Sequence, residues 1–477
     1  MLLKYFYLIY NKKINCFELS KYILKKIENI YNKNIFINLN YDFIFNQCFY
    51  SENLIKFKKN NILTGIPVIY KDAFNSKILK TTYGSRILKN YYSPYNSTVV
   101  NRLKNLGLIN FGKTNMDEFC TGSNCFNYYY GISKNPINLY FTSGGSSGGS
   151  SYLVFKNLIP VSIGTDTGGS IKEPSLFNNL IGFKPTYGRI SRYGIFSYSS
   201  SLDNVGFICK NIIDLSIFLN SLFNFDIKDS TTFNFSKEDF TRYLNKNWIL
   251  YKKNIKVFFG LFIGISKDFF SSIIDYEIKS NLENIITIFE YLGAKIIFVC
   301  LYFYKFFCSI YQFISSSELY SNISKYDNFL YNNFNFINYF KKKKFLFFSN
   351  EIKNKFFLGN YILSSNNNKK FFLYSKKLRK ILFEFLKKIF NICDIIIIPI
   401  VSKIILNPLK NINNFYNYID FYSSISNVLG LPCATIPTGF YFKNKFKIPL
   451  GIQIISNHFK EAKLIQIINE LSNYINF

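Results

Sequence analysis

Two loops rich in glycine and serine contain the residue types that could perform chemistry in this chain. The first spans residues 142–150 and reads Thr-Ser-Gly-Gly-Ser-Ser-Gly-Gly-Ser; the second spans residues 164–170 and reads Gly-Thr-Asp-Thr-Gly-Gly-Ser. Successive glycines allow several backbone N–H groups to converge on one point, as an oxyanion hole requires. A serine at the end of such a run, here Ser170, would lie beside the carbonyl carbon that it attacks. The pattern therefore predicts a serine nucleophile.

Two other uses of such loops are disfavoured by their sequences. Glycine-rich loops after strands also bind phosphate through backbone N–H groups. However, neither loop ends in the Gly-Lys-Ser/Thr of a P-loop, and neither has the G-x-G-x-x-G spacing of a dinucleotide site. Strand-like apolar segments flank both loops, which argues against a flexible linker.

The nucleophile needs a base, and the chain contains a single histidine, His458. It lies in a polar turn near the C-terminus, where a surface position is the ordinary interpretation. A histidine-based triad would depend on it, so we expect catalysis without histidine. The alternative base is a lysine amine kept neutral by burial, which lowers a lysine pKa. Lys71 ends the apolar run at 66–70, but spacing alone leaves it one candidate among many lysines.

The segments that must position these groups alternate between strand-like and helix-like patterns. Buried strands are predicted for four apolar runs: residues 65–70, 108–112, 158–163 and 393–399. Helices are predicted where apolar residues recur at helical spacing: residues 17–30, 99–106, 376–390 and 461–474. Residues 429–432 and 436–439 contain glycine and proline and are interpreted as turns between core strands. This alternation predicts an α/β fold with a mostly parallel or mixed sheet.

Composition limits the possible partners and the compartment. The formal charge of +30 could indicate a nucleic-acid partner. Yet Lys, Asn, Ile, Phe and Tyr are overused throughout, which an A/T-rich genome would explain, and the lysines form no single stripe. Nine cysteines without a CxxC pair, and a single histidine, disfavour a metal site and fit a reducing cytosol.

Export and membrane insertion are both disfavoured, so we expect a cytoplasmic bacterial protein, with an organelle as the alternative. No apolar run reaches the roughly 20 residues that cross a bilayer. The apolar start of the chain is interrupted by Lys4 and is followed by no cleavage site for a signal peptide. No internal repeat or linker divides the chain, and a single domain over residues 1–477 is expected.

The run Gly-Gly-Ser-Ser-Gly-Gly-Ser at 144–150, followed by Asp-Thr-Gly-Gly-Ser at 166–170, resembles the amidase signature family. The resemblance implies a large mixed β-sheet covered by helices on both faces, with the signature core at about 60–210. It also implies a catalytic triad of Lys71 as base, Ser146 as proton shuttle on a cis peptide bond, and Ser170 as nucleophile.

The same resemblance implies the other parts of the catalytic loop. The backbone N–H groups of Thr167, Gly168, Gly169 and Ser170 would hold the oxyanion. Asp166 is interpreted as an anchor of this loop rather than a proton-transfer group. A non-catalytic descendant of an amidase is disfavoured because all three triad residues persist in a strongly biased composition.

Motifs along most of the chain narrow the resemblance to the glutaminase subunits of the glutamyl-tRNA(Gln)/aspartyl-tRNA(Asn) amidotransferases. They lie at residues 115–119, 184–194, 200–203, 229–231, 316–318 with 321–322 and 326–327, and 451–455. Such subunits hydrolyse glutamine through a glutamyl ester and supply ammonia that converts misacylated Glu-tRNA(Gln) or Asp-tRNA(Asn). A tRNA-binding subunit, which uses ATP and Mg²⁺, would complete a heterotrimer with a small bridging subunit. No cofactor is implied on this chain. A stand-alone amidase acting on small amides is the alternative, since its triad would be identical.

Glutamine recognition needs a carboxylate for the α-ammonium and a cation for the α-carboxylate. The resemblance places the carboxylate at Asp420 and the cation at Lys355, where the family has arginine. Lysine keeps the charge but loses the bidentate fork, so weaker or less selective glutamine binding is expected. Three further departures from the family surround the nucleophile: Lys172, Glu173 and Asn178.

Overall fold

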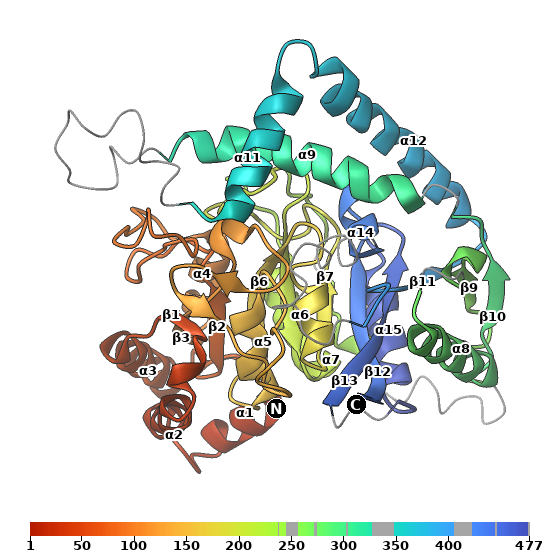
Figure 1. The fold of residues 1–477 in the computed structure, drawn as a ribbon. Coiled ribbons are helices and arrows are strands. Elements are labelled where there is room, and N and C mark those ends of the chain that lie inside the picture. The colour runs from red at the N-terminus through yellow and green to blue at the C-terminus, as the bar shows by residue number, and fades with distance from the viewer. Residues whose placement is uncertain are drawn as a thin grey trace, which may run out of the picture.

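The computed structural model describes residues 1–236, 238–244, 256–270, 274–301, 304–326, 348–404, 422–443 and 446–475. In these residues an 11-stranded mixed sheet has the order β1-β3-β2-β6-β8-β7-β12-β13-β11-β9-β10. Helices lie on both sides of this sheet, and Figure 1 shows α5 and α6 in front of the central strands. The predicted α/β architecture with a mixed sheet is therefore confirmed.

The strands of the large sheet are β1 Phe36–Asn38, β2 Pro67–Lys71, β3 Ile109–Thr114, β6 Val161–Asp166, β7 Ile181–Lys184, β8 Asn204–Cys209, β9 Phe262–Ile265, β10 Lys295–Phe298, β11 Ile395–Pro399, β12 Cys433–Lys443 and β13 Phe446–Ser456. Two short strands, β4 Phe126–Asn127 and β5 Gly131–Ile132, form a separate ribbon.

The helices are α1 Leu2–Tyr10, α2 Cys16–Glu28, α3 Tyr41–Lys56, α4 Thr98–Asn105, α5 Gly148–Phe155, α6 Lys172–Phe177, α7 Ile212–Leu222, α8 Tyr276–Tyr291, α9 Tyr304–Ser324, α11 Asn350–Leu363, α12 Tyr374–Ile389, α14 Ile425–Val428 and α15 Glu461–Leu471. In Figure 1, α9, α11 and α12 lie along the top of the molecule.

Parallel pairing of β2 with β6 positions the two glycine-serine loops. Ile69 lies opposite Ser162 in this pair, and every residue of both strands is buried. Parallel strands end at the same edge of a sheet, so Lys71, the last residue of β2, lies beside the loop that follows β6. Helix α5 begins within the first glycine-serine loop and packs against both β2 and β6. Both loops therefore meet at this edge.

Most of the predicted elements are confirmed with small shifts of their ends, but one prediction is wrong. Residues 436–439 form no turn; they lie inside β12, which pairs with β13 along its whole length. The strand accommodates its proline and glycine by a register irregularity between Pro437 and Gly439, where Gly439 has a φ of 143°. Glycine inside a strand often marks such a bulge rather than a chain reversal.

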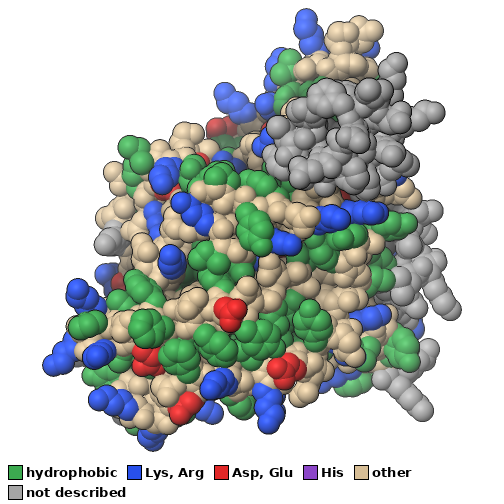
Figure 2. Space-filling view, turned by 90° about the vertical axis from the view of Figure 1, so that its left-hand side faces the viewer, with side chains coloured by type: hydrophobic (Ala, Val, Ile, Leu, Met, Phe, Trp, Pro, Cys, Tyr) green, Lys and Arg blue, Asp and Glu red, His purple; other side chains and the backbone are tan. Residues whose placement is uncertain are grey.

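The surface agrees with the dispersed charge of the sequence. Figure 2 shows the face that carries α2–α4, where lysine and arginine side chains are scattered among apolar and uncharged ones. In the part of the chain that the structure describes, no helix is long and apolar enough to cross a membrane. All nine cysteines are free thiols.

Candidate active site

Three side chains that are distant in the sequence form a hydrogen-bonded chain at the shared edge of β2 and β6. Lys71 Nζ donates to Ser146 Oγ at 2.6 Å, and Ser146 Oγ donates to Ser170 Oγ at 2.8 Å. Lys71 and Ser146 have no exposed surface, whereas Ser170 is 8% exposed. The Gly145–Ser146 peptide bond is cis. The structure thus brings together the three predicted residues in the order that proton transfer between Ser170 and Lys71 requires.

The loop between β6 and α6 presents backbone amides beside Ser170. Among the described residues, none accepts a hydrogen bond from the amide of Gly168, Gly169 or Ser170. Side chains also approach both glycines closely. A Cβ at Gly168 would lie 2.5 Å from Tyr311 Oη, and a Cβ at Gly169 would overlap with the carboxyl group of Glu173. This loop can therefore donate several N–H groups to a developing oxyanion.

Thr167, the first residue of this loop, is held by a buried carboxyl group on Asp203. The Thr167 hydroxyl donates to Asp203 Oδ1 at 2.6 Å, and the Ser199 amide donates to Asp203 Oδ2 at 2.9 Å. Burial raises the pKa of Asp203 to about 7, although the hydrogen bond from Thr167 and the charge of Arg192 oppose this shift. Asp203 belongs to the motif at 200–203, but nothing in its spacing indicates the contact with Thr167.

Lys172, which the resemblance marks as a departure, is fully buried and connects the second glycine-serine loop to α14. Lys172 Nζ lies 3.5 Å from Asp166 Oδ1 and donates to Ser426 Oγ at 3.0 Å. Asn427 Nδ2 and the Ile171 amide also donate to the Asp166 carboxylate, each at 2.7 Å. Burial alone would raise the pKa of Asp166, but Lys172 and these hydrogen bonds hold the pKa below its usual value. Asp166 is therefore an ionised anchor of the loop.

Replacing Lys172 by Met should lower the free energy of unfolding by about 3–5 kcal/mol, because the Asp166 carboxylate would remain buried without its cation. The depressed pKa of Asp166 gives a stabilisation that is present above the unfolded pKa of about 3.9 and is lost as the pH falls through the folded value. Urea denaturation at neutral and acidic pH measures both effects. Lys172→Arg, which keeps the charge, should cost far less. Equal stability of the Met variant and the wild type would contradict this assignment.

The other two departures, Glu173 and Asn178, are also buried and stay clear of the triad. Ser423 Oγ donates to Glu173 Oε1 at 2.9 Å. Asn178 Nδ2 donates to the carbonyl oxygens of Ser143 at 2.7 Å and Pro174 at 2.6 Å. Asn178 therefore links the first glycine-serine loop to α6.

The two residues predicted to bind substrate have different outcomes. Lys355, on α11, donates to Tyr198 Oη at 3.0 Å and is half-buried. Because a phenol is neutral, this contact positions the amine without cancelling its positive charge. Asp420 lies outside the described residues.

Asp117 is a buried acid near the triad that sequence reasoning placed in a motif without giving it a role. Its Oδ2 accepts from the Cys125 amide at 3.1 Å and lies against Gly145, where a Cβ would overlap with it. Burial raises the pKa of Asp117 to about 7, while the positive charges of Lys71 and Lys355 oppose the shift. Asp117 thus packs directly behind the Gly145–Ser146 peptide and experiences the charge of both lysines.

Burial alone does not distinguish Lys71, because four described lysines have no exposed surface: Lys71, Lys113, Lys172 and Lys184. Lys113 lies 3.5 Å from the Asp72 carboxylate, and Lys184 donates to the carbonyl oxygen of Leu431. Lys71 differs because the serine that it contacts, Ser146, in turn contacts Ser170. Contact with a serine hydroxyl is what a base for that serine needs.

The histidine occupies a different environment from the predicted one. His458 is half-buried rather than a freely exposed surface residue, and its Nε2 lies 2.9 Å from the carbonyl oxygen of Leu429. Burial lowers the pKa of His458, although the contact with Leu429 opposes the shift. In the described residues its polar contacts join it to the turn before β12 and not to the triad.

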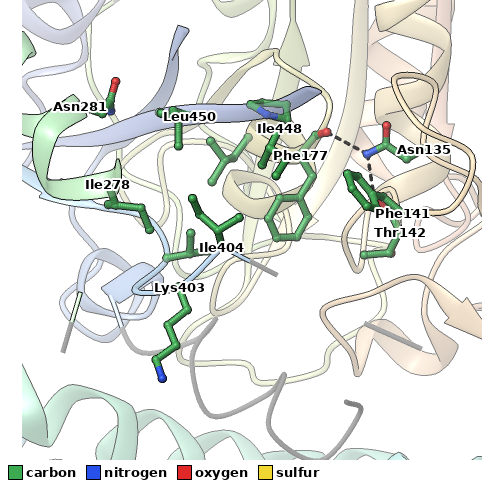
Figure 3. Close-up of a pocket in the computed structure, with 14 residues that line it drawn as sticks. Asn135, Phe141, Thr142, Phe177, Ile278, Asn281, Lys403, Ile404, Ile448 and Leu450 are labelled. Atoms are coloured by element: carbon green, nitrogen blue, oxygen red, sulfur yellow. Dashed lines mark hydrogen bonds between the residues drawn. The ribbon is translucent and has the colours of Figure 1, made fainter. Parts of the chain in front are cut away.

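An apolar pocket beside the start of the first glycine-serine loop contains none of the three residues Lys71, Ser146 and Ser170. Figure 3 shows it between β13, α8 and the loop before α5, with Asn135 donating to the carbonyl oxygens of Thr142 at 3.0 Å and Phe177 at 2.8 Å. Its described lining residues include no acid, cysteine, serine or histidine. The pocket therefore offers mainly apolar contact, with Lys403 as the charged residue of its described lining.

The fold and this site define a class of α/β enzymes in which a serine beside a glycine-rich loop is connected through a second serine to a buried lysine. The Amidase family model matches residues 18–465, and the chain belongs to this family of enzymes.

Two similar relatives both have the name of the A subunit of glutamyl-tRNA(Gln) amidotransferase. The protein from Nitrosomonas eutropha is 36% identical over 466 residues, which cover 96% of this chain and 93% of that protein. The protein from Paraburkholderia phytofirmans is 34% identical over 463 residues, with the same two coverages.

Solved structures agree with this fold. The A subunit of the glutamyl-tRNA(Gln) amidotransferase from Thermotoga maritima has a TM-score of 0.72 at 28% identity, covering 88% of this chain and 85% of that one. A 6-aminohexanoate cyclic dimer hydrolase has a TM-score of 0.83 at 18% identity, covering 100% of this chain and 97% of that one. At that identity, the second likeness concerns the fold alone.

Proposed function

We propose that this chain is the glutamine-hydrolysing subunit of a tRNA-dependent amidotransferase. The observation that carries the proposal is its similarity, over nearly its whole length, to relatives named as the A subunit of such an enzyme. The hydrogen-bonded chain Lys71–Ser146–Ser170 supports the chemistry, since it supplies a nucleophile and a route for its proton. We extend the single-domain assignment to residues 1–477, because the family match covers most of this length.

Acylation begins with Lys71 in its neutral form. Lys71 Nζ accepts the Ser146 proton while Ser146 Oγ accepts the Ser170 proton, which reverses the direction of the two hydrogen bonds. The Ser170 oxygen bonds to the side-chain carbonyl carbon of glutamine. The resulting oxyanion accepts hydrogen bonds from the amides of residues 167–170, each worth about 10²–10³-fold in rate in comparable enzymes.

The intermediate then collapses with release of ammonia. The carbon–nitrogen bond breaks as the proton held by Lys71 returns through Ser146 to the leaving nitrogen. Ser170 is left as a glutamyl ester. A water molecule attacks this ester by the same relay, which releases glutamate and restores the Ser170 hydroxyl. Atoms and protons therefore balance over the cycle without a cofactor on this chain.

Substrate binding uses charge at both ends of the glutamine backbone. Lys355 binds the α-carboxylate, and Asp420 binds the α-ammonium group. A lysine ammonium makes a point contact where a guanidinium would make two parallel hydrogen bonds, so this site favours a modest affinity for glutamine.

The ammonia serves partner subunits in the cytoplasm. A tRNA-binding subunit that uses ATP and Mg²⁺ activates misacylated Glu-tRNA(Gln) or Asp-tRNA(Asn), and ammonia converts the activated group to the amide. A small bridging subunit completes the heterotrimer. The competing function is a stand-alone amidase for small amides, which the same triad would serve.

Purification of the tagged chain from its native cell tests this choice. We expect a stoichiometric complex with two partners, one a tRNA-binding subunit and the other small, and this complex should amidate misacylated tRNA with glutamine. Mass spectrometry identifies the subunits, and an amidation assay measures the activity. Recovery of the chain alone, with full activity on small amides, would instead establish the stand-alone amidase.

A further inference from the structure

We propose that Thr165 is a positioning residue for the catalytic base: its hydroxyl group holds Lys71 Nζ against Ser146. The inference rests on the serine chemistry proposed above and adds a residue to it. Lys71 Nζ donates to Thr165 Oγ1 at 2.9 Å and lies 3.5 Å from the Thr165 carbonyl oxygen. With Ser146 Oγ at 2.6 Å, the amine has three oxygen partners.

A lysine amine at the end of four methylene groups loses much rotamer freedom when it is held in one place. Lys71 has no exposed surface, so bulk water cannot provide the polar partners that its amine needs. The Thr165 contacts provide them in addition to the contact with Ser146. Without the Thr165 hydroxyl, the amine keeps fewer partners and can move away from Ser146.

The position of Thr165 in the sheet makes it suited to this task. It lies on β6, which pairs with β2 on one side and with β8 on the other, where Thr165 faces Val205. Its side chain is 3% exposed, and a β-branched side chain has a strongly restricted χ1 angle. Ser146, by contrast, lies in a loop before α5. A rigid strand residue therefore fixes the amine, and the amine in turn orients the loop serine.

Two titratable groups that follow β3 also lie within the influence of Lys71. Asp117 experiences the positive charge of Lys71, as described above. Cys120 Sγ lies 3.6 Å from Thr165 Oγ1, and burial raises the pKa of this thiol while the charge of Lys71 opposes the shift. No hydrogen bond joins either described group to the amine, whereas Thr165 contacts it directly through one.

The test compares Thr165→Val, which removes the hydroxyl at nearly constant shape, with Thr165→Ser, which keeps it. The readout is the rate at which phenylmethanesulfonyl fluoride modifies Ser170, measured by intact-protein mass spectrometry between pH 6 and 10. In this reaction the Ser170 oxygen bonds to sulfur, fluoride leaves, and the proton passes through Ser146 to Lys71. The readout therefore reports activation of the nucleophile and does not depend on glutamine being the substrate.

We expect Thr165→Val to reduce the rate of Ser170 modification at the high-pH plateau about 10-fold or more. Small displacements of catalytic groups lower reaction rates by up to about 10²-fold. We also expect the rising part of its pH–rate profile to move to lower pH, because a hydrogen bond to a charged form favours that form and its loss does the opposite. Thr165→Ser should keep the pH dependence of the wild-type protein. If Thr165 had a purely structural role, its loss would lower the rate of Ser170 modification without moving the pH–rate profile.

An unchanged profile in Thr165→Val would overturn the inference, as would equal defects in the Val and Ser variants. Thr165→Ala provides a second hydroxyl-free variant, and its profile should move in the same direction. Absence of Ser170 modification in the wild-type protein would contradict the proposed serine chemistry instead, so the two failures are distinguishable.

Discussion

Ser170→Ala should reduce glutamine hydrolysis by the purified complex on the order of 10⁴-fold or more, because no covalent intermediate can form without the Ser170 oxygen. Residual activity would come from the loop amides and from substrate binding. The variant should fold normally, since the change removes one oxygen of a residue that is 8% exposed and whose described side-chain contact is with Ser146. Release of glutamate from glutamine measures the loss.

The same variant separates the two halves of the proposed reaction. When ammonia replaces glutamine, the complex that contains Ser170→Ala should amidate misacylated tRNA at the wild-type rate, because the tRNA-binding partner performs that step. Ser175→Ala is the matched control: Ser175 is a buried serine on α6 whose hydroxyl donates to the Ile171 carbonyl oxygen at 2.7 Å. It should retain both activities. Loss of ammonia-dependent amidation in an assembled Ser170→Ala complex would refute the division of labour.

The sequence indicates the proposed nucleophile more directly than the proposed base. A serine that ends a glycine run has a local signature, because the glycines and the serine belong to one loop. Lys71 acquires its role from pairing between β2 and β6, which places it against Thr165, 94 residues further along the chain. The residues next to Lys71 in the sequence do not indicate that pairing. Burial does not select Lys71 either, because three other described lysines are equally buried. Only the family resemblance selected Lys71.

The role of Lys172 could likewise not be predicted from its neighbours in the sequence. Lys172 looks anomalous in the sequence, but its partners Ser426 and Asn427 are more than 250 residues away. In the structure it supplies the positive charge that Asp166 needs. The wrongly predicted turn at 436–439 has a related cause, because proline and glycine act locally whereas the pairing of β12 with β13 decides the outcome.

Lys71→Met should reduce hydrolysis on the order of 10⁴-fold, nearly as much as loss of the nucleophile, because the proton of Ser170 then has no acceptor beyond Ser146. Lys71→Arg should be similarly inactive, since a guanidinium keeps the charge but cannot act as a base near neutral pH. This pair of variants distinguishes a residue that accepts a proton from one that only supplies a positive charge. Steady-state glutaminase assays, with thermal unfolding as a check on folding, measure the effect.

A double variant tests whether Lys71 and Ser146 act together. Because Lys71 and Ser146 act in one relay, Lys71→Met combined with Ser146→Ala should cost about as much as either change alone, rather than the sum of the two free-energy losses. Additive losses would mean that the residues act independently, and an active Lys71→Met enzyme would remove Lys71 as the base. In that second case Lys113, Lys172 and Lys184 offer no substitute, since none of their described contacts is with Ser146 or Ser170.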